Sequence, residues 1–316
     1  MSAVAIGIIG CGRMGRERAR SAALCGARMT AVYDADQERA EALASQHNGC
    51  RVAKSALDVV HGAPSAVFIC SPPSSRGPIE LAAIDAQIPF LVEKPVGVSA
   101  AQATPILEKL SGSNLVHAVG YQNRCRRSVE HAKQILTGRT ILAISAFWVG
   151  RKYLVPWWLR SEDSGGPINE QATHLIDMSR HLCGEIAGFS CCLGAVEAGT
   201  KDVLSAAIAL RFKSGAFGSL IYSCEAKDKQ IGIRVITDDG GLTLSGWDLV
   251  LTQNEIDSSG LETQVDDVFV VDTKRFLDAV AENRPESVSC TFKDAWQTQT
   301  AVDQIRASNG IQWRAL

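Results

Sequence analysis

The feature that most constrains this chain is a glycine-rich turn near its N-terminus. An apolar run over residues 3–9 meets Gly10-Cys11-Gly12-Arg13-Met14-Gly15, and a stretch rich in Ala, Arg and Glu follows. This order predicts a strand, a phosphate-binding turn and a helix. Gly10 permits the tight turn, Gly12 lets the backbone approach a pyrophosphate, and Gly15 lets the helix close on the strand. The alternative is a glycine-rich turn in an unrelated α/β protein.

An acidic residue stands where this fingerprint requires one. The apolar stretch 29–33 ends in Asp34, about twenty residues after the turn, where a carboxylate can accept hydrogen bonds from an adenosine ribose. We predict NAD as the cofactor, with NADP less favoured, because a 2′-phosphate would meet Asp34 and Asp36 as like charges. Arg39 can swing toward the adenine or a phosphate, and a solvated arginine on the following helix is the alternative.

Length and composition indicate a soluble enzyme of two domains. The chain has 316 residues, 46% of them hydrophobic, which exceeds the size at which one core stops growing. Its net charge is -2, and no run of Lys and Arg exceeds a pair, so we expect no nucleic-acid partner. Because no stretch is long and apolar enough for a membrane span, and the first strand begins at the N-terminus, we expect no membrane association and a cytoplasmic location.

The cysteines favour packing over chemistry. The chain has ten of them, without a CxxC pair. We therefore interpret them as buried thiols in a reducing compartment, and we expect no metal site.

The pattern of apolar stretches changes near residue 120. Before it, predicted strands and helices alternate, which indicates a parallel, doubly wound sheet; the strands are 29–33, 66–70, 90–92 and 116–120, and the helices are 37–46, 79–86 and 101–111. After it, hairpins dominate: 203–212 with 216–223, and a second pair turning at Asp239-Gly240. Helices are predicted at 129–136, 273–283 and 293–308. We place the domain boundary between 1–122 and 123–316, and we expect the open face of the second sheet to lie in a subunit interface.

Polar residues follow two of the predicted parallel strands, where ligands bind in such sheets. Strand 66–70 ends in Ser71-Pro72-Pro73-Ser74, which can border a nicotinamide ribose or be a plain turn. Strand 90–92 runs into Glu93-Lys94-Pro95, and Lys94 is the first catalytic candidate. A cis Lys94–Pro95 bond would aim the ammonium inward; a surface ion pair is the alternative.

A third cluster lies on a predicted helix that opens with Gly165-Gly166-Pro167 and ends at Gly184. Four polar residues share one face at helical spacing, and this face suits a binding site better than open solvent: Glu170, His174, Asp177 and His181. The core stripe of the same helix is Ile168, Ala172, Leu175, Ile176 and Ser179. A solvated face is one alternative, and a metal site from Glu170 and His174 is another, although a third ligand at metalloprotease spacing is absent.

Together these motifs resemble the Gfo/Idh/MocA family, the glucose–fructose oxidoreductase and inositol dehydrogenase group, across nearly the whole chain. The resemblance rests on the glycine turn, Ser71-Pro72, Glu93-Lys94-Pro95, Gly120-Tyr121 to Arg124, Gly165-Gly166 with Glu170-Gln171 and His174 to Asp177, and Phe276 to Val280 with Asp294-Ala295. It implies an α/β fold: an N-terminal Rossmann domain, with its doubly wound parallel sheet, and a C-terminal α/β domain with an open, mostly antiparallel sheet. It also implies a homodimer or homotetramer formed through that second sheet.

The same resemblance assigns residues to the site. It implies Lys94 as the catalytic lysine, His174 as the acid/base histidine, and Glu170 at a position where many members have aspartate. The predicted cofactor-binding residues are Gly10, Gly12, Arg13, Met14, Gly15, Asp34, Arg39, Ser71, Pro72, Ser75, Glu93, Lys94 and Gln122. The predicted substrate-binding residues are Lys94, Tyr121, Arg124, Arg151, Tyr153, Trp157, Asn169, Glu170 and His174, with core packing as the rival explanation for Trp157 and Trp158. Besides Glu170, the chain departs from the family pattern at Pro73 and Arg76, which replace the usual Asn and His.

Reference pKa values divide the catalytic roles. A lysine must drop from ~10.4 by about three units to act as a base near neutrality, whereas a histidine at ~6.5 needs almost no change. We therefore expect His174 to accept the proton and Lys94 to donate to the oxygen that loses hydride, with the exchanged roles as the alternative. The predicted function is hydride transfer between NAD and a secondary alcohol or ketone of a sugar, inositol or related polyol. The alternatives are an NAD-dependent glycoside hydrolase and a non-catalytic NAD(H)-sensing regulator.

Overall fold

The chain folds into two compact units. The computed structural model describes residues 4–158, 160–194, 196, 202–254 and 267–308. The first unit comprises Met1–Gln122 and Asp267–Gln297, and the second comprises Asn123–Asp266 and Thr298–Leu316. The chain passes between the units at residue 122, where the domain boundary was predicted, but residues 267–297 return to the first unit, which the single predicted boundary does not include. None of the described helices is both long enough and apolar enough to span a bilayer.

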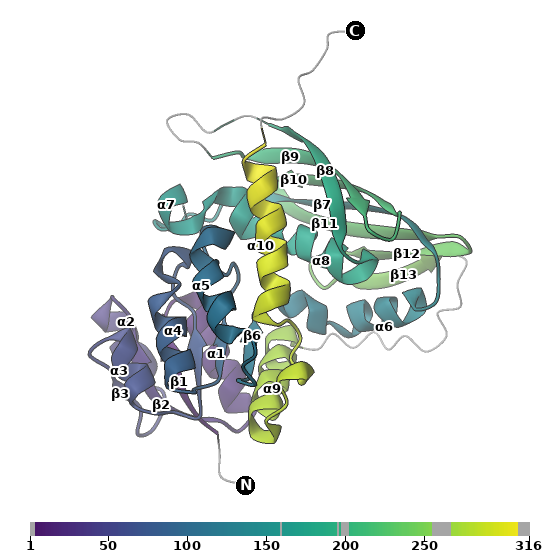
Figure 1. Ribbon diagram of the computed structural model, residues 1–316. Coiled ribbons are helices and arrows are strands. Elements are labelled where there is room, and N and C mark those ends of the chain that lie inside the picture. Colours follow the sequence, from purple (N-terminus) through teal and green to yellow (C-terminus); the bar gives the residue numbers. More distant parts are fainter. Residues whose placement is uncertain (1–3, 159, 195, 197–201, 255–266, 309–316) are drawn as a thin grey trace. The chain divides into compact units, whose positions relative to one another are not determined.

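The first unit is built on a six-stranded parallel sheet with the order β3-β2-β1-β4-β5-β6. Its strands are β1 Ala5–Ile9, β2 Arg28–Tyr33, β3 Arg51–Val52, β4 Ala66–Ile69, β5 Phe90–Val92 and β6 His117–Val119. Its helices are α1 Arg13–Leu24, α2 Gln37–Ala44, α3 Ala56–His61, α4 Pro78–Asp85, α5 Ala100–Leu110 and α9 Val268–Glu282. In Figure 1 these are the purple and blue segments together with yellow-green α9.

Both faces of this sheet are buried. Ile6 and Ile8 of β1 pack with residues of α1, α2 and α9, whereas Ile9 packs with residues of α3, α4 and α5. The returning helix α9 belongs to the first group because its Phe276 meets Phe68 of β4 edge to face, with ring centroids 5.4 Å apart. The doubly wound sheet predicted from the alternating pattern is therefore confirmed.

The second unit is built on a seven-stranded mixed sheet with the order β13-β12-β11-β7-β10-β9-β8, in which only β7 and β10 pair in parallel. Its strands are β7 Ile141–Arg151, β8 Ile186–Leu193, β9 Ser205–Phe212, β10 Phe217–Ser223, β11 Glu225–Thr237, β12 Gly240–Ser245 and β13 Val250–Asn254. Its helices are α6 Arg127–Leu136, α7 Ser161–Ser164 and α8 Thr173–Cys183, and α10 Phe292–Arg306 enters it at Thr298. Both predicted hairpins are confirmed, as is the mostly antiparallel character.

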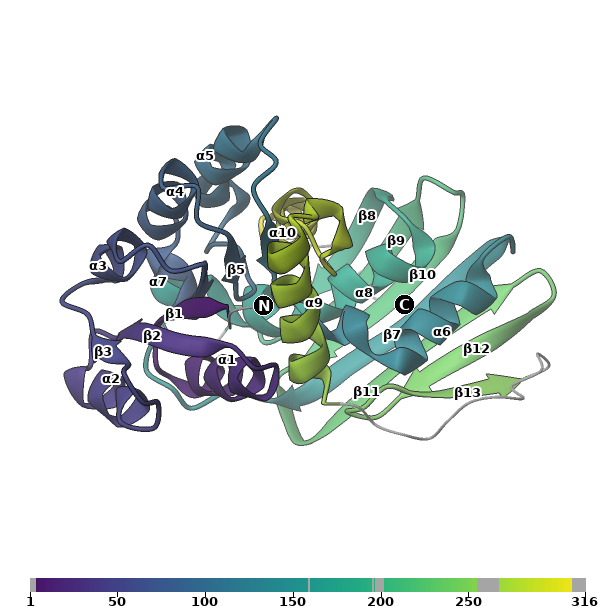
Figure 2. The same ribbon diagram turned by 90° about the horizontal axis from the view of Figure 1, so that it is seen from below.

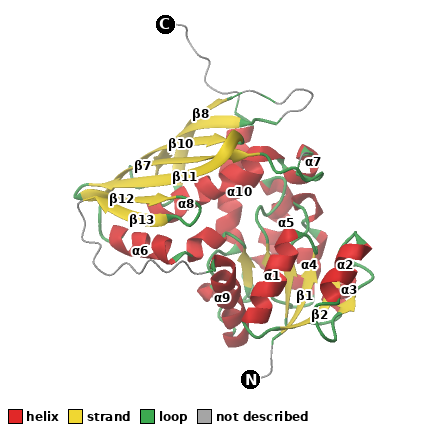
Figure 3. Cartoon of the chain, turned by 180° about the vertical axis from the view of Figure 1, so that it is seen from behind, coloured by secondary structure: helices red, strands yellow, loops and turns green. Residues whose placement is uncertain are grey.

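Helices cover one face of the second sheet. The alternate residues Ile144, Ala146 and Trp148 of β7 are buried against apolar side chains of α6, α8 and α10. Figures 2 and 3 show α6 and α8 together on one side of the strands. On the other face Phe147 is 41% exposed and Ile221, its neighbour on β10, is 48% exposed. Within the second unit, no described helix covers this face.

Candidate functional site

The turn between β1 and α1 has the geometry that the sequence predicted. Gly10 adopts φ +93°, and a Cβ on it would lie 2.6 Å from the carbonyl carbon of Cys70. A Cβ on Gly15 would lie 1.8 Å from the Gly10 carbonyl oxygen, so helix and turn touch directly there. A Cβ on Gly12, the N-cap of α1, meets no atom within 4 Å. Open space therefore lies beside Gly12, at the N-terminus of α1, where a helix leaves N–H groups that can bind a pyrophosphate.

Asp34 is tied to the same turn. Its Oδ2 accepts a hydrogen bond from the Cys11 N–H at 2.6 Å, and its Oδ1 accepts one from the Asp36 N–H at 2.9 Å. A carboxylate has about four acceptor positions, so Asp34 retains capacity for ribose hydroxyls. Arg39 lies on α2 and pairs with Asp36 at 3.0 Å, both side chains being exposed. Of the other predicted cofactor residues here, Arg13 is exposed and Met14 is half-buried.

The segment after β4 forms a closed polar turn. Ser75 Oγ lies 2.7 Å from Ser71 Oγ and donates to the Pro72 carbonyl oxygen, also at 2.7 Å. Arg76 is buried and donates to Ser71 Oγ at 3.3 Å and to the Glu93 carbonyl oxygen at 2.9 Å. Arg76, which departs from the family pattern, thus joins the ends of β4 and β5.

The Glu93-Lys94-Pro95 segment follows β5, and its Lys94–Pro95 peptide bond is cis, as expected. The Glu93 carboxylate lies in the interior, where Arg18 Nε donates to its Oε1 at 2.7 Å. Glu93 therefore supports the turn from within, a role that the sequence did not reveal. Lys94 is half-buried, whereas Tyr121 and Gln122, which follow β6, are buried.

The predicted helix over residues 165–183 is only partly α-helical. After Gly165, a π-helical turn spans Ile168–Ala172, and α8 begins at Thr173. A π turn carries one more residue than an α turn and occurs frequently at functional sites. The predicted core stripe is buried, and Asn169, Glu170 and Gln171 of the π turn are buried as well.

Two amides anchor this turn on either side of Glu170. Asn169 Nδ2 donates to the Ser164 carbonyl oxygen at 2.8 Å, and its Oδ1 accepts from Gln299 Nε2 at 2.7 Å. Gln171 Nε2 donates to the Arg151 carbonyl oxygen at 3.1 Å. Both ends of the Asn169 amide, which was predicted to bind substrate, thus contact other parts of the chain. The anchors hold Glu170 between them.

A tyrosine from the sheet completes this anchoring. The Tyr222 hydroxyl, on β10, lies 3.1 Å from Gln171 Oε1 and 3.2 Å from the Pro167 carbonyl oxygen, which share its proton. Burial, together with nearby Cys224, raises the pKa of Tyr222 far above its usual range, so this phenol is a neutral donor. Tyr222 was not among the predicted site residues, because its only signal in the sequence is its place on the buried face of an alternating strand.

An indole fixes the plane of the His174 imidazole. The two rings of His174 and Trp148 stack with centroids 5.2 Å apart and planes at 8°. Trp148 is buried on β7, and the Lys229 ammonium lies 4.9 Å from its ring centroid. The sequence analysis also missed Trp148, because it did not identify β7.

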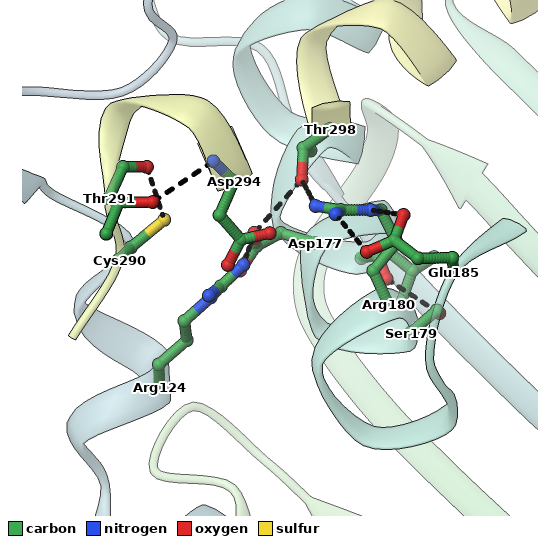
Figure 4. A network of polar contacts seen from close by, with 10 residues as sticks. Arg124, Asp177, Ser179, Arg180, Glu185, Cys290, Thr291, Asp294 and Thr298 are labelled. Carbon is green, nitrogen blue, oxygen red and sulfur yellow. Dashed lines mark hydrogen bonds and ion pairs between the residues drawn. The ribbon is translucent and has the colours of Figure 1, made fainter. Parts of the chain in front are cut away.

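A polar network holds α8 one turn beyond His174 (Figure 4). Arg124 donates to both oxygens of Asp177, from Nε at 2.9 Å and from Nη2 at 2.6 Å. Thr298 Oγ1 donates to Asp177 Oδ1 at 3.1 Å and accepts from Arg180 Nη1 at 2.7 Å. Arg180 also pairs with Glu185 at 2.7 Å. Arg124, predicted to bind substrate, thus anchors α8. Asp177, predicted to share a polar face suited to a binding site, is 2% exposed.

The remaining predicted residues divide by burial. Arg151 and Tyr153 are exposed, and Trp157 packs half-buried against the core of the second unit. Trp158 is a core residue that meets Tyr153 edge to face at 5.7 Å. Lys94 belongs to the first unit, and Glu170 and His174 belong to the second. Among the described residues, no three His, Cys, Asp or Glu side chains gather as a metal site requires.

Known proteins resemble this chain in both units. An inositol 2-dehydrogenase of Saccharopolyspora erythraea is 31% identical over 185 residues, 57% of this chain and 54% of that protein, so the chain covers about half of its length. A myo-inositol 2-dehydrogenase of Thermotoga maritima is 24% identical over 306 residues, 90% of each chain. The solved UDP-N-acetylglucosamine 3-dehydrogenase of Acidithiobacillus ferrooxidans shares the fold, with a TM-score of 0.85, 22% identity and 97% of each chain covered.

Two family descriptions match consecutive parts of the chain. Residues 4–121 match the GFO_IDH_MocA oxidoreductase family with its NAD-binding Rossmann fold. Residues 132–243 match the GFO/IDH/MocA C-terminal domain. Together with the phosphate-binding turn and the open second sheet, these matches show that the chain belongs to the GFO/IDH/MocA oxidoreductase family.

Proposed function

We propose that this protein is an NAD-dependent oxidoreductase that transfers hydride between nicotinamide and a secondary alcohol or ketone of a sugar, inositol or related polyol. The observation that carries the proposal is the open cradle at Gly12, in front of the first turn of α1. NAD is preferred to NADP because Asp34 and Asp36 would repel a 2′-phosphate, and Arg39 is already paired with Asp36. The names of the relatives support the polyol class.

We propose that Lys94, His174 and Glu170 act in the same reaction. When bound, NAD supplies the nicotinamide that exchanges the hydride. In the oxidation direction, His174 accepts the hydroxyl proton, and the Lys94 ammonium donates a hydrogen bond to the same oxygen as its negative charge develops. Glu170 orients His174 or holds a neighbouring hydroxyl. The stack on Trp148 supports this assignment, because an imidazole with a fixed plane loses less freedom when it engages the substrate.

Nicotinamide absorbance tests the proposal. The assay uses NAD and then NADP with inositols, aldoses, uronates and nucleotide sugars, and it compares the wild type with Lys94→Met and His174→Asn. We expect turnover with NAD that falls by roughly 10²–10⁴-fold in either variant, while calorimetry shows that NAD still binds. Tight NAD binding without polyol turnover would contradict the proposal and redirect the search to glycoside hydrolysis or NAD(H) sensing.

We also propose that the protein is a homo-oligomer that associates through the open face of the second sheet. Phe147, Phe217 and Ile221 place exposed apolar side chains on adjacent strands of that face. The test is light scattering on a Phe147→Lys/Ile221→Lys variant, with Leu24→Lys, an exposed leucine of α1, as the control. We expect the double variant alone to lower the molar mass to that of one chain. A wild-type monomer would overturn this proposal.

The cysteines support a cytoplasmic location, which we propose as well. All ten are free thiols, as a reducing compartment requires. Fractionation of cells that express the tagged protein tests this location.

A further inference from the structure

A buried arginine lies behind the turn that carries Lys94. Arg18 of α1 is 0% exposed. Its Nε donates to Glu93 Oε1 at 2.7 Å, and its Nη1 lies 2.8 Å from Asp272 Oδ2 and 3.1 Å from Thr273 Oγ1. One guanidinium thus joins α1, the residue before Lys94 and the returning helix α9.

The rest of Glu93 is held as firmly as its carboxylate. Its N–H donates to the Ile69 carbonyl oxygen at 2.9 Å, and its own carbonyl oxygen accepts from Arg76 Nη2 at 2.9 Å. Gly120 closes the remaining side, because a Cβ there would lie 2.8 Å from both Arg18 Nη2 and Glu93 Oε2. Side chain and backbone of Glu93 therefore have one position, and the Cα of Lys94 follows directly from it.

The cluster holds one cation, Arg18, between two carboxylates, Glu93 and Asp272. Burial alone would lower the pKa of Arg18, but Glu93 and Asp272 raise it, so the guanidinium stays charged. A buried pair of this kind adds little net stability, but it is costly to break and can specify one arrangement of the chain. Here the fixed arrangement also fixes the backbone at Lys94, because Lys94 directly follows Glu93.

We propose that Arg18 is a positioning residue for Lys94, acting through Glu93, and that Asp272 holds Arg18 in place. The proposal rests on the proposed function for what Lys94 does, but not for where it is held. A misplacement of about 1 Å at a reacting group can cost roughly 10²-fold in rate, so a small shift of Glu93 has a measurable effect on turnover.

The chain offers a matched control on the same helix. Arg20 also joins α1 to the returning segment, through Asp267 at the N-cap of α9. Its side chain is 48% exposed, and its other ion pair is with Glu17. Loss of Arg20 therefore weakens the tie between the two helices without touching Glu93.

The experiment compares Arg18→Met, Gly120→Ala and Arg20→Met in the full chain. Gly120→Ala keeps every charge and pushes a methyl group against the Arg18–Glu93 pair, so it remains informative if Arg18→Met does not fold. Each variant is measured for melting temperature, NAD affinity, kcat and KM. The rate at which trinitrobenzenesulfonate labels Lys94, followed by mass spectrometry across a pH series, reports on the lysine itself.

We expect Arg18→Met and Gly120→Ala to lower kcat by about tenfold or more, to leave KM within about twofold, and to change the labelling rate of Lys94. Arg20→Met should match the wild type in kcat and labelling, even where its melting temperature falls. If Gly120→Ala labels and turns over like the wild type, the positioning role is wrong. If the wild type turns over no polyol, the proposed function fails, and the labelling rates still decide whether Arg18 positions Lys94.

Discussion

The two units place polar groups in different ways. In the first unit, the sheet is buried on both faces, and Ser71, Glu93 and Lys94 follow the ends of its parallel strands. In the second unit, the sheet is covered by helices on one face, and Glu170 and His174 lie on a π turn and the helix after it. A strand end needs only a turn to present a side chain. In the second unit Glu170 lies on an irregular turn instead, which Asn169 and Gln171 anchor.

The two units also differ in the sign of the charge at the centre of their buried polar clusters. In the first unit one cation, Arg18, lies between the carboxylates of Glu93 and Asp272. In the second unit one anion, Asp177, receives both arms of Arg124 and the hydroxyl of Thr298. Each cluster has one member close to a proposed catalytic residue in sequence: Glu93 directly precedes Lys94, and Asp177 follows His174 by three residues. In both units, therefore, buried polar groups fix the segment that carries a proposed catalytic residue. The following substitutions test this comparison.

The largest effect is expected at the glycine turn. Gly15→Ala puts a methyl group 1.8 Å from the Gly10 carbonyl oxygen, so the backbone must move, and we expect a loss of more than about 4 kcal/mol of unfolding free energy. Gly12→Ala meets no protein atom and should change stability by less than about 0.5 kcal/mol while weakening NAD binding. Urea denaturation and calorimetry with NAD check both. Equal stability losses in the two variants would contradict the cradle at Gly12.

The next largest loss of stability is expected in the second unit, at Asp177. Asp177→Ala leaves Arg124 buried without its carboxylate, and we expect a cost of about 3 kcal/mol in unfolding free energy. Asp163→Ala is the control, because its partner Arg160 has a side chain that is 59% exposed and stays in contact with water, so its loss should cost below about 1 kcal/mol. Urea denaturation measures both. The buried network is unimportant for α8 if the two variants lose the same amount.

The smallest effect is expected at Glu80, a buried carboxylate that, unlike Glu93 and Asp177, has no arginine of the described chain within hydrogen-bond distance. Glu80 of α4 is fully buried, its Oε2 accepts from the Gly77 N–H, and its nearest arginine nitrogen, on Arg76, is 3.9 Å away. Burial raises the pKa of Glu80 from 4.5 despite Arg76. The folded chain therefore holds this proton more tightly than the unfolded chain does. The stability that it contributes is lost as the pH rises from the pKa of Glu80 in the unfolded chain through its higher pKa in the folded chain.

Glu80→Gln keeps the hydrogen bond to Gly77 and removes this titration. We expect the free energy of unfolding of the variant to increase steadily relative to that of the wild type as the pH rises from 4.5. Chemical denaturation at a series of pH values measures the difference. A difference that shrinks with pH would reverse the sign assigned to Glu80.

The sequence predicted those parts of the molecule that depend on local chemistry. The glycine turn, Asp34 and the cis bond at Pro95 follow from residues that are neighbours or share a fingerprint. The hairpins at Gly215 and Gly240 follow from turn residues. The fold of the second unit and the roles of Glu170 and His174 came from the family resemblance instead, because alternating strands specify no partner order.

Other features depend on contacts that a linear pattern does not contain. Strand β7, at the centre of the second sheet, was not identified, although its buried positions alternate from Ile144 to Trp148. The π turn was missed because the helical spacing of its apolar residues resembles an ordinary helix. Arg18 and Asp272 belong to no motif in the sequence, and only the folded chain brings them together in the interior.

The return of α9 to the first unit has a consequence for synthesis. Thr273 lies 255 residues after Arg18, so a ribosome that adds about 5–20 residues per second needs roughly 13–50 s to deliver it. During that interval Arg18 in the nascent first unit can pair with Glu93, next to Lys94, but its second carboxylate, Asp272, has not yet been synthesised. Proteolysis of stalled chains should find this unit open until α9 has left the exit tunnel, so the emergence of α9 is the step that completes the first unit.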